Sequence, residues 1–313
     1  MHIFSSETIH SENHSITHDI LAKANVYLDI KREDQIHQHV SGNKFRKLKY
    51  NLLYAKEQGY TKVLTFGGAY SNHITATSAA ANMLGLQSIG VIRGEERGRD
   101  LGKTLSEYPT LQFAASQGMG FTFVTREAYR NKTAIEFTDQ LQDKFGACYH
   151  IPEGGTNILA VKGCEEILAP EDHVYDIICC AVGTGGTIAG IINSSHAHQK
   201  VLGFPALKGD FLKKEIEKFT VKKNWELVND YHFGGYGKIN QEGVEFMNSF
   251  YEQQSVLLDP LYTAKMIFGI FDRVQKGVFK KNTRILAVHT GGLQGIAGMN
   301  QKLRKKKLPL IRI

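Results

Sequence analysis

The sequence predicts an α/β protein built around parallel β-sheets, and three observations support this prediction. Short apolar runs alternate with segments of helical periodicity along most of the 313 residues. Glycine-rich turns follow several of the runs, as they do between strand and helix in parallel sheets. The length corresponds to about two domains at roughly 100–200 residues each. Ligands of such sheets bind at the carboxyl ends of strands, so the functional site is expected in the turns that follow strands.

The expected strands are short runs rich in β-branched residues and bounded by polar or glycine-containing turns. Such runs lack a strict alternation of apolar and polar residues, which is typical of strands buried on both faces of a sheet. In chain order, strands are expected at residues 26–31, 62–66, 88–93, 121–124, 176–181, 201–204 and 284–289.

The expected helices are the segments between these strands in which apolar residues recur every three or four positions. Small or hydroxyl residues precede several of them, and such residues favour a helix start. In chain order, helices are expected at residues 43–58, 72–84, 134–145, 158–166, 187–194, 212–219, 244–253, 263–276 and 293–305.

Composition and charge narrow the possible classes of protein. With 38 Lys and Arg against 31 Asp and Glu, the net charge is +7, and basic residues cluster at 302–307. A basic end can bind nucleic acid, but cations also suit the last turn of a helix. No aromatic-interleaved basic surface, helix–turn–helix or zinc signature accompanies the cluster. We therefore expect no nucleic-acid partner.

The apolar runs and the first residues bear on location. No run approaches the roughly 20 residues of a membrane-spanning helix. Residues 1–18 are polar and charged and lack the apolar core of a secretory signal. A cytoplasmic protein without a membrane segment is the expectation.

Cysteine and histidine usage argues against disulfides and a structural metal. The chain has four cysteines, and Cys179 and Cys180 are adjacent within an apolar run, as expected of buried thiols. His10, His14 and His18 are spaced four apart, but no cysteine or carboxylate completes a recognisable metal site. We interpret the acidic residues of this region as solvated or ion-paired; they are Asp19, Asp29, Glu33 and Asp34.

Three turns that follow expected strands combine glycines with hydroxyl residues. They occupy residues 67–73, 183–187 and 289–292. Each places small residues at a helix start, where backbone N–H groups and the helix dipole attract an anion. Three such turns in one chain predict a phosphorylated or carboxylated ligand.

The turn at 183–187 reads Gly-Thr-Gly-Gly-Thr and matches neither common nucleotide-binding motif. Ile188 stands where the dinucleotide fingerprint has its third glycine. A Walker A loop fails at Gly102-Lys103-Thr104, because Arg97 stands five positions before Gly102. The two remaining interpretations are a cup for one phosphate and an ordinary strand-to-helix turn.

Lys44 and Lys47 lie on the first turn of the expected helix 43–58, three residues apart and on one face. The helix dipole disfavours a cation there and lowers the pKa of a lysine, as a lysine that attacks an aldehyde requires. Two solvated surface lysines are the alternative. Tyr236 and Tyr262 lie in turns before expected helices, where each either packs in the core or faces a pocket.

These segments occur together and in a characteristic order: Gly-Asn-Lys at 42–44, Gly-Gly-x-x-Ser-Asn-His, Gly-Thr-Gly-Gly-Thr, a tyrosine after Asp-Pro, and a final His-Thr-Gly-Gly. From about residue 20 to about residue 300, the chain resembles the pyridoxal 5'-phosphate (PLP) enzymes of the 1-aminocyclopropane-1-carboxylate deaminase / D-cysteine desulfhydrase family. The resemblance implies PLP fold type II, as in the tryptophan synthase β chain. It also implies a larger PLP-binding domain at 1–47 plus 156–313, a smaller inserted domain at 48–155, and a homodimer.

The resemblance also implies roles for individual residues. Lys44 would bond covalently to the cofactor aldehyde and later act as a base, and Lys47 would help bind the phosphate. Asn72 would hydrogen-bond the phenolic oxygen, and Ser71 would hold the substrate carboxylate or act as a nucleophile or proton carrier. Tyr236 and Tyr262 would line the substrate side. The phosphate cup would consist of Gly183, Thr184, Gly185, Gly186 and Thr187.

Thr263 and Thr290 bear on the substrate, a small amino acid. By the family pattern, deaminases have a glutamate in place of Thr263 and an apolar residue in place of Thr290. A threonine hydroxyl beside the pyridine nitrogen gives a weaker electron sink than an acid, and this resembles the desulfhydrase branch. The expected reaction is β-elimination from D-cysteine to pyruvate, ammonia and sulfide.

Two alternatives stay open. The first is 1-aminocyclopropane-1-carboxylate deaminase chemistry, which gives 2-oxobutyrate and ammonia and requires Ser71 or Tyr262 to act on the ring. The second is a protein of another class that binds PLP or nucleic acid without catalysis.

Overall fold

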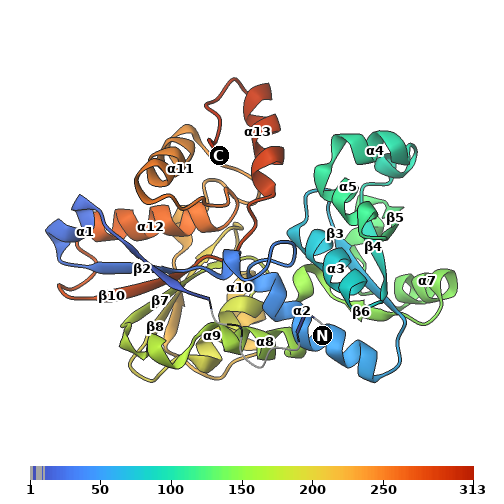
Figure 1. Ribbon diagram of the computed structural model, residues 1–313, viewed down its shortest axis with the longest axis horizontal. Helices are drawn as coiled ribbons and strands as arrows, with labels where there is room; N and C mark the ends of the chain where they lie inside the picture. Colours follow the sequence, from blue (N-terminus) through green and yellow to red (C-terminus); the bar gives the residue numbers. More distant parts are fainter. Residues whose placement is uncertain (1–2, 5–8, 10) are drawn as a thin grey trace.

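The computed structural model describes residues 3–4, 9 and 11–313. Figure 1 shows two β-sheets, the larger on the left and the smaller on the right, each flanked by helices. The prediction of an α/β protein is confirmed. The larger sheet has the order β1-β2-β10-β7-β8-β9 and the smaller β5-β4-β3-β6. The strands are β1 Asn13–Ile16, β2 Tyr27–Lys31, β3 Lys62–Gly67, β4 Gln87–Arg93, β5 Gly120–Val124, β6 Tyr149–Ile151, β7 Ile177–Val182, β8 Lys200–Pro205, β9 Trp225–Leu227 and β10 Arg284–Val288.

The six-stranded sheet is parallel except for β1, which pairs antiparallel with β2. Its central strands β7 and β10 are buried on both faces, which explains why their sequences are continuous apolar runs. One face packs against α1 (Asp19–Ala24), α11 (Gln241–Gln254) and α12 (Thr263–Gln275). The other packs against α8 (Ile158–Cys164) and α9 (Gly186–Ser194).

The four-stranded sheet is entirely parallel and comes from the uninterrupted stretch 62–151. Helices α2 (Asn43–Glu57), α3 (Asn72–Met83) and α5 (Pro109–Ser116) cover one face. Helices α6 (Arg126–Arg130) and α7 (Ile135–Phe145) cover the other. Helix α2 contacts both α8 and α3, so it connects the two groups of elements. The domain boundaries expected at 47/48 and 155/156 stay a prediction.

All the expected strands and helices occur, within a few residues at their ends. Several elements were not expected: β1, β6, β9, α1, α5, α6 and α4 (Leu101–Glu107). The three strands have three or four residues and lie at sheet edges, where one side needs no apolar partner. The helices are too short for a periodicity to be visible. The remaining helices are α10 (Phe211–Glu217) and α13 (Gly295–Lys305).

The cysteine interpretation is confirmed, since all four are free and Cys179 and Cys180 are fully buried. His10, a member of the histidine series, lies outside the described residues. Among the residues that the structure describes, no helix is long and apolar enough to cross a membrane.

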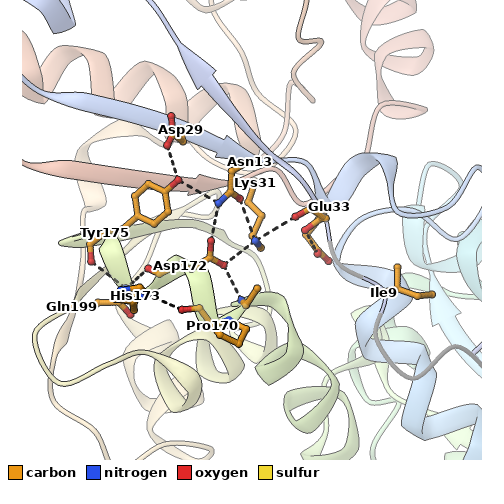
Figure 2. A network of polar contacts seen from close by, with 12 residues as sticks. Ile9, Asn13, Asp29, Lys31, Glu33, Pro170, Asp172, His173, Tyr175 and Gln199 are labelled. Atoms are coloured by element: carbon orange, nitrogen blue, oxygen red, sulfur yellow. Dashed lines mark hydrogen bonds and ion pairs between the residues drawn. The ribbon is translucent and has the colours of Figure 1, made fainter.

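Polar side chains join β1 and β2 to the segment that contains Ala169 and Asp172 (Figure 2). The Lys31 ammonium lies 2.8 Å from the Asp172 carboxylate, and both side chains are 1% exposed. Asn13 donates to the same carboxylate at 2.8 Å and accepts from Lys31 at 3.2 Å. The Ala169 N–H donates to Asp172 as well, at 2.8 Å. Every member of the network is satisfied, as a buried charge requires.

A second buried ion pair lies beside the first. Arg46 on α2 donates two hydrogen bonds to Glu33, at 2.8 and 3.0 Å, and Ser11 donates a third at 2.7 Å. Glu33 is 0% exposed. The acid is therefore ion-paired, one of the two states expected for it, and it fixes α2 relative to β2.

Candidate active site

Segments far apart in the sequence meet at the carboxyl ends of β3, β7 and β10. The Asn43 side chain donates to Thr187 Oγ1 at 2.8 Å, and the Asn43 backbone N–H donates to the carbonyl of Thr290 at 3.3 Å. A Cβ on Gly292 would lie 2.6 Å from Nδ2 of Asn72. The three turns singled out in the sequence thus line one site, together with the start of α2.

Gly42 makes the close approach of two of these turns possible. It has φ 64°, in the left-handed region that favours glycine. A Cβ at this position would lie 2.0 Å from the carbonyl oxygen of Thr290. The sequence Gly-Asn-Lys therefore places Lys44 on the first turn of α2, directly against the turn that follows β10.

The Lys44 amine is set up as a nucleophile. Its Nζ donates to Asn43 Oδ1 at 2.9 Å, and the side chain is half-buried. Burial, and secondly the nearby Lys47 ammonium, lower the pKa of Lys44 to about 7, against a smaller opposing effect of Cys164 and Asp259. The sequence interpretation assigned this lowering to the helix dipole, whereas the structure assigns most of it to burial.

The lowered pKa of Lys44 predicts the pH dependence of its reaction with an aldehyde. Only the free amine attacks, and its fraction rises with pH through about 7. We expect the rate at which apoenzyme captures pyridoxal, trapped by borohydride and located by mass spectrometry, to rise with that midpoint and then level off. Exposed lysines should show a midpoint near their ordinary pKa of about 10.4. A midpoint for Lys44 above about 9 would contradict the assignment.

Lys47 lies beneath the turn at 183–187 with its ammonium buried. Its Nζ donates to Gly154 O at 3.0 Å, to Thr156 Oγ1 at 2.9 Å and to Thr184 Oγ1 at 3.3 Å. Burial lowers the pKa of Lys47. The turn itself begins α9, with Gly185 at φ 87°. An anion held there would meet an ammonium, hydroxyls and the unpaired N–H groups of a helix start.

The cup has a second wall that the sequence interpretation missed. Gly154, Gly155 and Thr156 follow β6 and precede α8, and Thr156 Oγ1 lies 2.5 Å from Thr184 Oγ1. A Cβ on Gly186 would lie 2.8 Å from the Thr156 side chain. The signal was available, because Gly-Gly-Thr before the expected helix 158–166 is the same kind of turn as the other three.

Substitution of Lys47 with methionine tests its role as an anion anchor. We expect the Kd for PLP to rise roughly 10- to 100-fold, since a hydrogen bond to a charged group contributes about 1.5–3 kcal/mol. Pyridoxal, which lacks the phosphate, is the matched control ligand and should bind both proteins about equally. Equilibrium dialysis measures both affinities. An equal loss for the two ligands would place Lys47 away from the phosphate.

The turn after β3 presents Ser71 and Asn72 at the start of α3. Ser71 caps the helix, its Oγ accepting from the Ile74 N–H at 3.4 Å. Asn72 Oδ1 is buried and has no hydrogen-bond partner among the described residues. A buried polar atom without a partner is costly. Its presence fits a ligand that hydrogen-bonds there.

His73, the next residue, was quoted in the sequence motif but given no role. Its Nε2 lies 2.7 Å from Thr65 Oγ1, whose own proton goes to the Ile151 carbonyl at 2.9 Å. Nδ1 is buried and has no partner within the described chain. Burial and the ammonium groups of Lys44 and Lys47 lower the pKa of His73 well below 6.5. The imidazole is therefore neutral.

The rings of Tyr236 and Tyr262 lie next to each other, with centroids 6.2 Å apart; that they line the substrate side stays a prediction. A Cβ on Gly183 would lie 3.1 Å from the Tyr262 ring, so this tyrosine borders the cup. Burial, with smaller contributions from Tyr236 and Asp259, raises the pKa of Tyr262 well above 10. Tyr262 therefore keeps its proton at neutral pH.

Asp259, the acid of the Asp-Pro motif, was given no role in the sequence interpretation and holds the turn that carries Tyr262. Its buried carboxylate accepts from the N–H groups of Leu261, Tyr262 and Thr263 at 2.8–3.0 Å. Thr263 Oγ1 accepts from the Asp259 N–H at 2.8 Å and is 0% exposed. The Thr263 hydroxyl is thus bound within its own turn.

The residues of the site fit PLP. Lys44 offers an amine for the aldehyde, Lys47 with the two glycine–threonine turns offers an anion site, and Asn72 Oδ1 has no hydrogen-bond partner among the described residues. A comparison with protein families agrees. Residues 17–291 match the family described as pyridoxal-phosphate dependent enzyme. The chain belongs to this family of PLP-dependent enzymes.

Individual relatives show which members of this family the chain is similar to. A protein of Pyrococcus abyssi named "Putative 1-aminocyclopropane-1-carboxylate deaminase" is 32% identical over 290 residues, 85% of this chain and 84% of the relative. An Arabidopsis thaliana protein named "Bifunctional D-cysteine desulfhydrase/1-aminocyclopropane-1-carboxylate deaminase, mitochondrial" is 31% identical over 293 residues, 85% of this chain and 72% of the relative. The resemblance seen in the sequence is confirmed, and with it the cofactor, PLP.

Solved structures agree with the fold. A crystal structure described as that of an ACC deaminase homologue aligns with a TM-score of 0.81 at 28% identity, over 96% of this chain and 95% of the other. A tomato threonine deaminase, 17% identical, aligns with a TM-score of 0.64 over 96% of this chain and 85% of its own. The expected PLP fold type II is confirmed.

Proposed function

We propose that this PLP enzyme is a lyase that releases ammonia and a 2-oxoacid from a small α-amino acid, with cleavage of a bond at the β-carbon. The observation that carries the proposal is the half-buried Lys44 amine, with its pKa near 7, on the same helix turn as Lys47, which donates to the anion cup that Tyr262 borders. Bound PLP supplies the electron sink for such a reaction.

The protein residues then have separate tasks. Lys47 and the two glycine–threonine turns hold the phosphate and so fix the position of the ring. The start of α3, with Ser71, faces the site and suits the substrate carboxylate. Lys44 Nζ, whose amine is free at neutral pH in a large fraction of the molecules, would accept or return a proton at the substrate carbon.

The names of the relatives favour 1-aminocyclopropane-1-carboxylate as substrate over D-cysteine, which the sequence interpretation preferred. This amino acid has no Cα hydrogen, so its ring opens only if a residue attacks it or protonates the carbon that is released. Tyr262 keeps its proton because its pKa is raised, and it lies beside the cup. Tyr262 is therefore the proton donor that we propose, with Ser71 as the candidate nucleophile.

D-Cysteine is the second candidate, and Thr290 favours it. The hydroxyl of Thr290 has no hydrogen-bond partner among the described residues. Its backbone carbonyl accepts from the Asn43 N–H at the start of α2. A hydroxyl beside the pyridine nitrogen suits a reaction with a good leaving group such as sulfide. Thr263 supports this assignment less, because its hydroxyl is bound to Asp259.

The deciding experiment supplies PLP-loaded enzyme with 1-aminocyclopropane-1-carboxylate, D-cysteine and L-cysteine in parallel. Ring opening gives 2-oxobutyrate, whereas β-elimination gives pyruvate and sulfide. Chromatographic identification of the 2-oxoacid separates the two reactions. Full cofactor loading without any 2-oxoacid from small D- or L-amino acids would reject the lyase and favour the non-catalytic binding protein.

Tyr262→Phe separates the two chemistries within the site. Because it removes only the phenolic hydroxyl and with it the acidic proton, we expect turnover of 1-aminocyclopropane-1-carboxylate to fall about 10²-fold or more. Elimination from D-cysteine should change much less, because the departure of sulfide does not require a residue to protonate a carbon atom. The ratio of the two kcat values is the measurement. An equal fall for both substrates would make Tyr262 a positioning group instead of the proton donor.

A further inference from the structure

A buried lysine on α12 has no part in the proposed chemistry. The Lys265 side chain is 1% exposed, and its Nζ donates to the carbonyls of His232 and Gly235 at 2.9 Å each and of Ala206 at 3.4 Å. No carboxylate pairs with it among the described residues. A buried ammonium is costly unless its donors are satisfied, and here backbone carbonyls satisfy all three.

The carbonyls belong mainly to one irregular segment, residues 232–237, which we call the Tyr236 loop. Four of its six residues have positive φ: Phe233, Gly234, Gly235 and Gly237, at 50°, 86°, 116° and 68°. The loop belongs to no strand or helix, so it lacks the regular backbone pairing that would fix its shape. Two of the three Lys265 contacts fall on this loop, one on His232 at its start and one on Gly235, the second residue of its glycine pair.

The loop carries Tyr236 immediately after Gly235. The Tyr236 ring is exposed and lies 6.2 Å, centroid to centroid, from the ring of Tyr262. Tyr262 lies three residues before Lys265, where the chain enters α12. The same helix start therefore positions one tyrosine directly and the other through the ammonium.

We propose that Lys265 is a positioning residue, whose ammonium holds the Tyr236 loop so that Tyr236 faces Tyr262 on the substrate side of the site. The expected effect on turnover rests on the proposed function. The effect on the conformation of the Tyr236 loop does not, because it can be measured without substrate. Burial lowers the pKa of Lys265 to about 8, so the ammonium with its three donors predominates at pH 7.

Lys265→Met tests the proposal, since it keeps the chain length and removes the donors. Amide hydrogen exchange, read by mass spectrometry on PLP-loaded protein without substrate, should show lost protection in residues 230–238 and little change in α9 or β10. Lys238→Met is the matched control: it removes the same charge from an exposed position beside the loop and should leave the exchange unchanged. Wild-type protection of the loop in Lys265→Met would overturn the proposal.

Kinetics test the connection through Tyr236. We expect Lys265→Met to lower kcat/KM about tenfold, the size of one charge-assisted hydrogen bond, with the Kd for PLP changed less than about twofold. In a Tyr236→Ala background the same substitution should have little further effect, because the two residues act as one unit. An equal fall in both backgrounds would overturn the positioning role.

Misfolding of the variant and absence of turnover in the wild-type enzyme lead to different conclusions. If Lys265→Met does not fold, Lys265→Leu, which also removes every donor, is examined by the same exchange and kinetic measurements with the same criteria. If the wild-type enzyme turns over no amino acid, the proposed function fails, while the exchange measurement still decides whether Lys265 orders the loop.

Discussion

Lys44→Ala should lower the rate of 2-oxoacid release by at least ~10³-fold, because one substitution removes both the covalent attachment of the cofactor and the proton carrier. The amine is half-buried, with its pKa lowered to about 7, and its neighbours Lys47 and Asn43 cannot replace it, since each is bound to other groups of the site. Rates are measured with whichever amino acid gives a 2-oxoacid with the wild-type enzyme.

The covalent attachment is read separately from activity. Borohydride reduction followed by mass spectrometry should place the cofactor on Lys44 in the wild-type protein and find none bound in Lys44→Ala. Lys49→Ala is the matched control, because Lys49 lies on the same helix but pairs with Glu166 away from the site. Cofactor trapped on another lysine, with activity preserved in Lys44→Ala, would refute the assignment.

Asp172→Ala should destabilise the folded protein by about 3–5 kcal/mol, the cost of leaving a buried charge unpaired. The Lys31 ammonium, 1% exposed, would keep only Asn13 Oδ1 and the Ser11 carbonyl, at 3.2 and 3.4 Å. The Ala169 N–H and one N–H of Asn13 would also lose their acceptor. Urea unfolding at constant pH measures the change through the midpoint and the slope.

Two comparison variants sharpen this test. Glu96→Ala removes an acid from the exposed pair with Arg126, and exposed pairs contribute little to stability because water screens them. The double variant Lys31→Met with Asp172→Leu removes both charges and should recover part of the loss, because no charge is then left unpaired. A loss for Asp172→Ala as small as that for Glu96→Ala would mean that water reaches Lys31.

Local patterns singled out several segments that the structure brings together. Lys44 and the turn at 183–187 were noticed because each depends on its immediate neighbours: a lysine at a helix start, and glycines with hydroxyls before a helix. The long strands and helices were predictable for the same reason, since burial on one or two faces leaves a periodic trace in the sequence.

The roles of other residues in the site cannot be predicted from their neighbours in the sequence. Asp259 stands in the Asp-Pro motif, but its three backbone partners are what show that it holds the turn of Tyr262. Lys265 resembles any helical lysine until the carbonyls of residues 206, 232 and 235 surround it. For Lys44, sequence reasoning gave the direction of the pKa change but assigned it to the dipole instead of burial.

The sequence by itself determined the fold class, because periodicity along the chain encodes strands, helices and turns, and its resemblance to a known family gave the cofactor; Lys44 as the residue that holds the cofactor stays a prediction. Only the tertiary structure decided which turns share a cup, as Thr156 with Thr184, and which charges are buried as pairs, as Lys31 with Asp172. The physical reason is that burial and hydrogen bonding depend on distances between residues far apart in the chain. Those distances are set when the two sheets and α2 pack together.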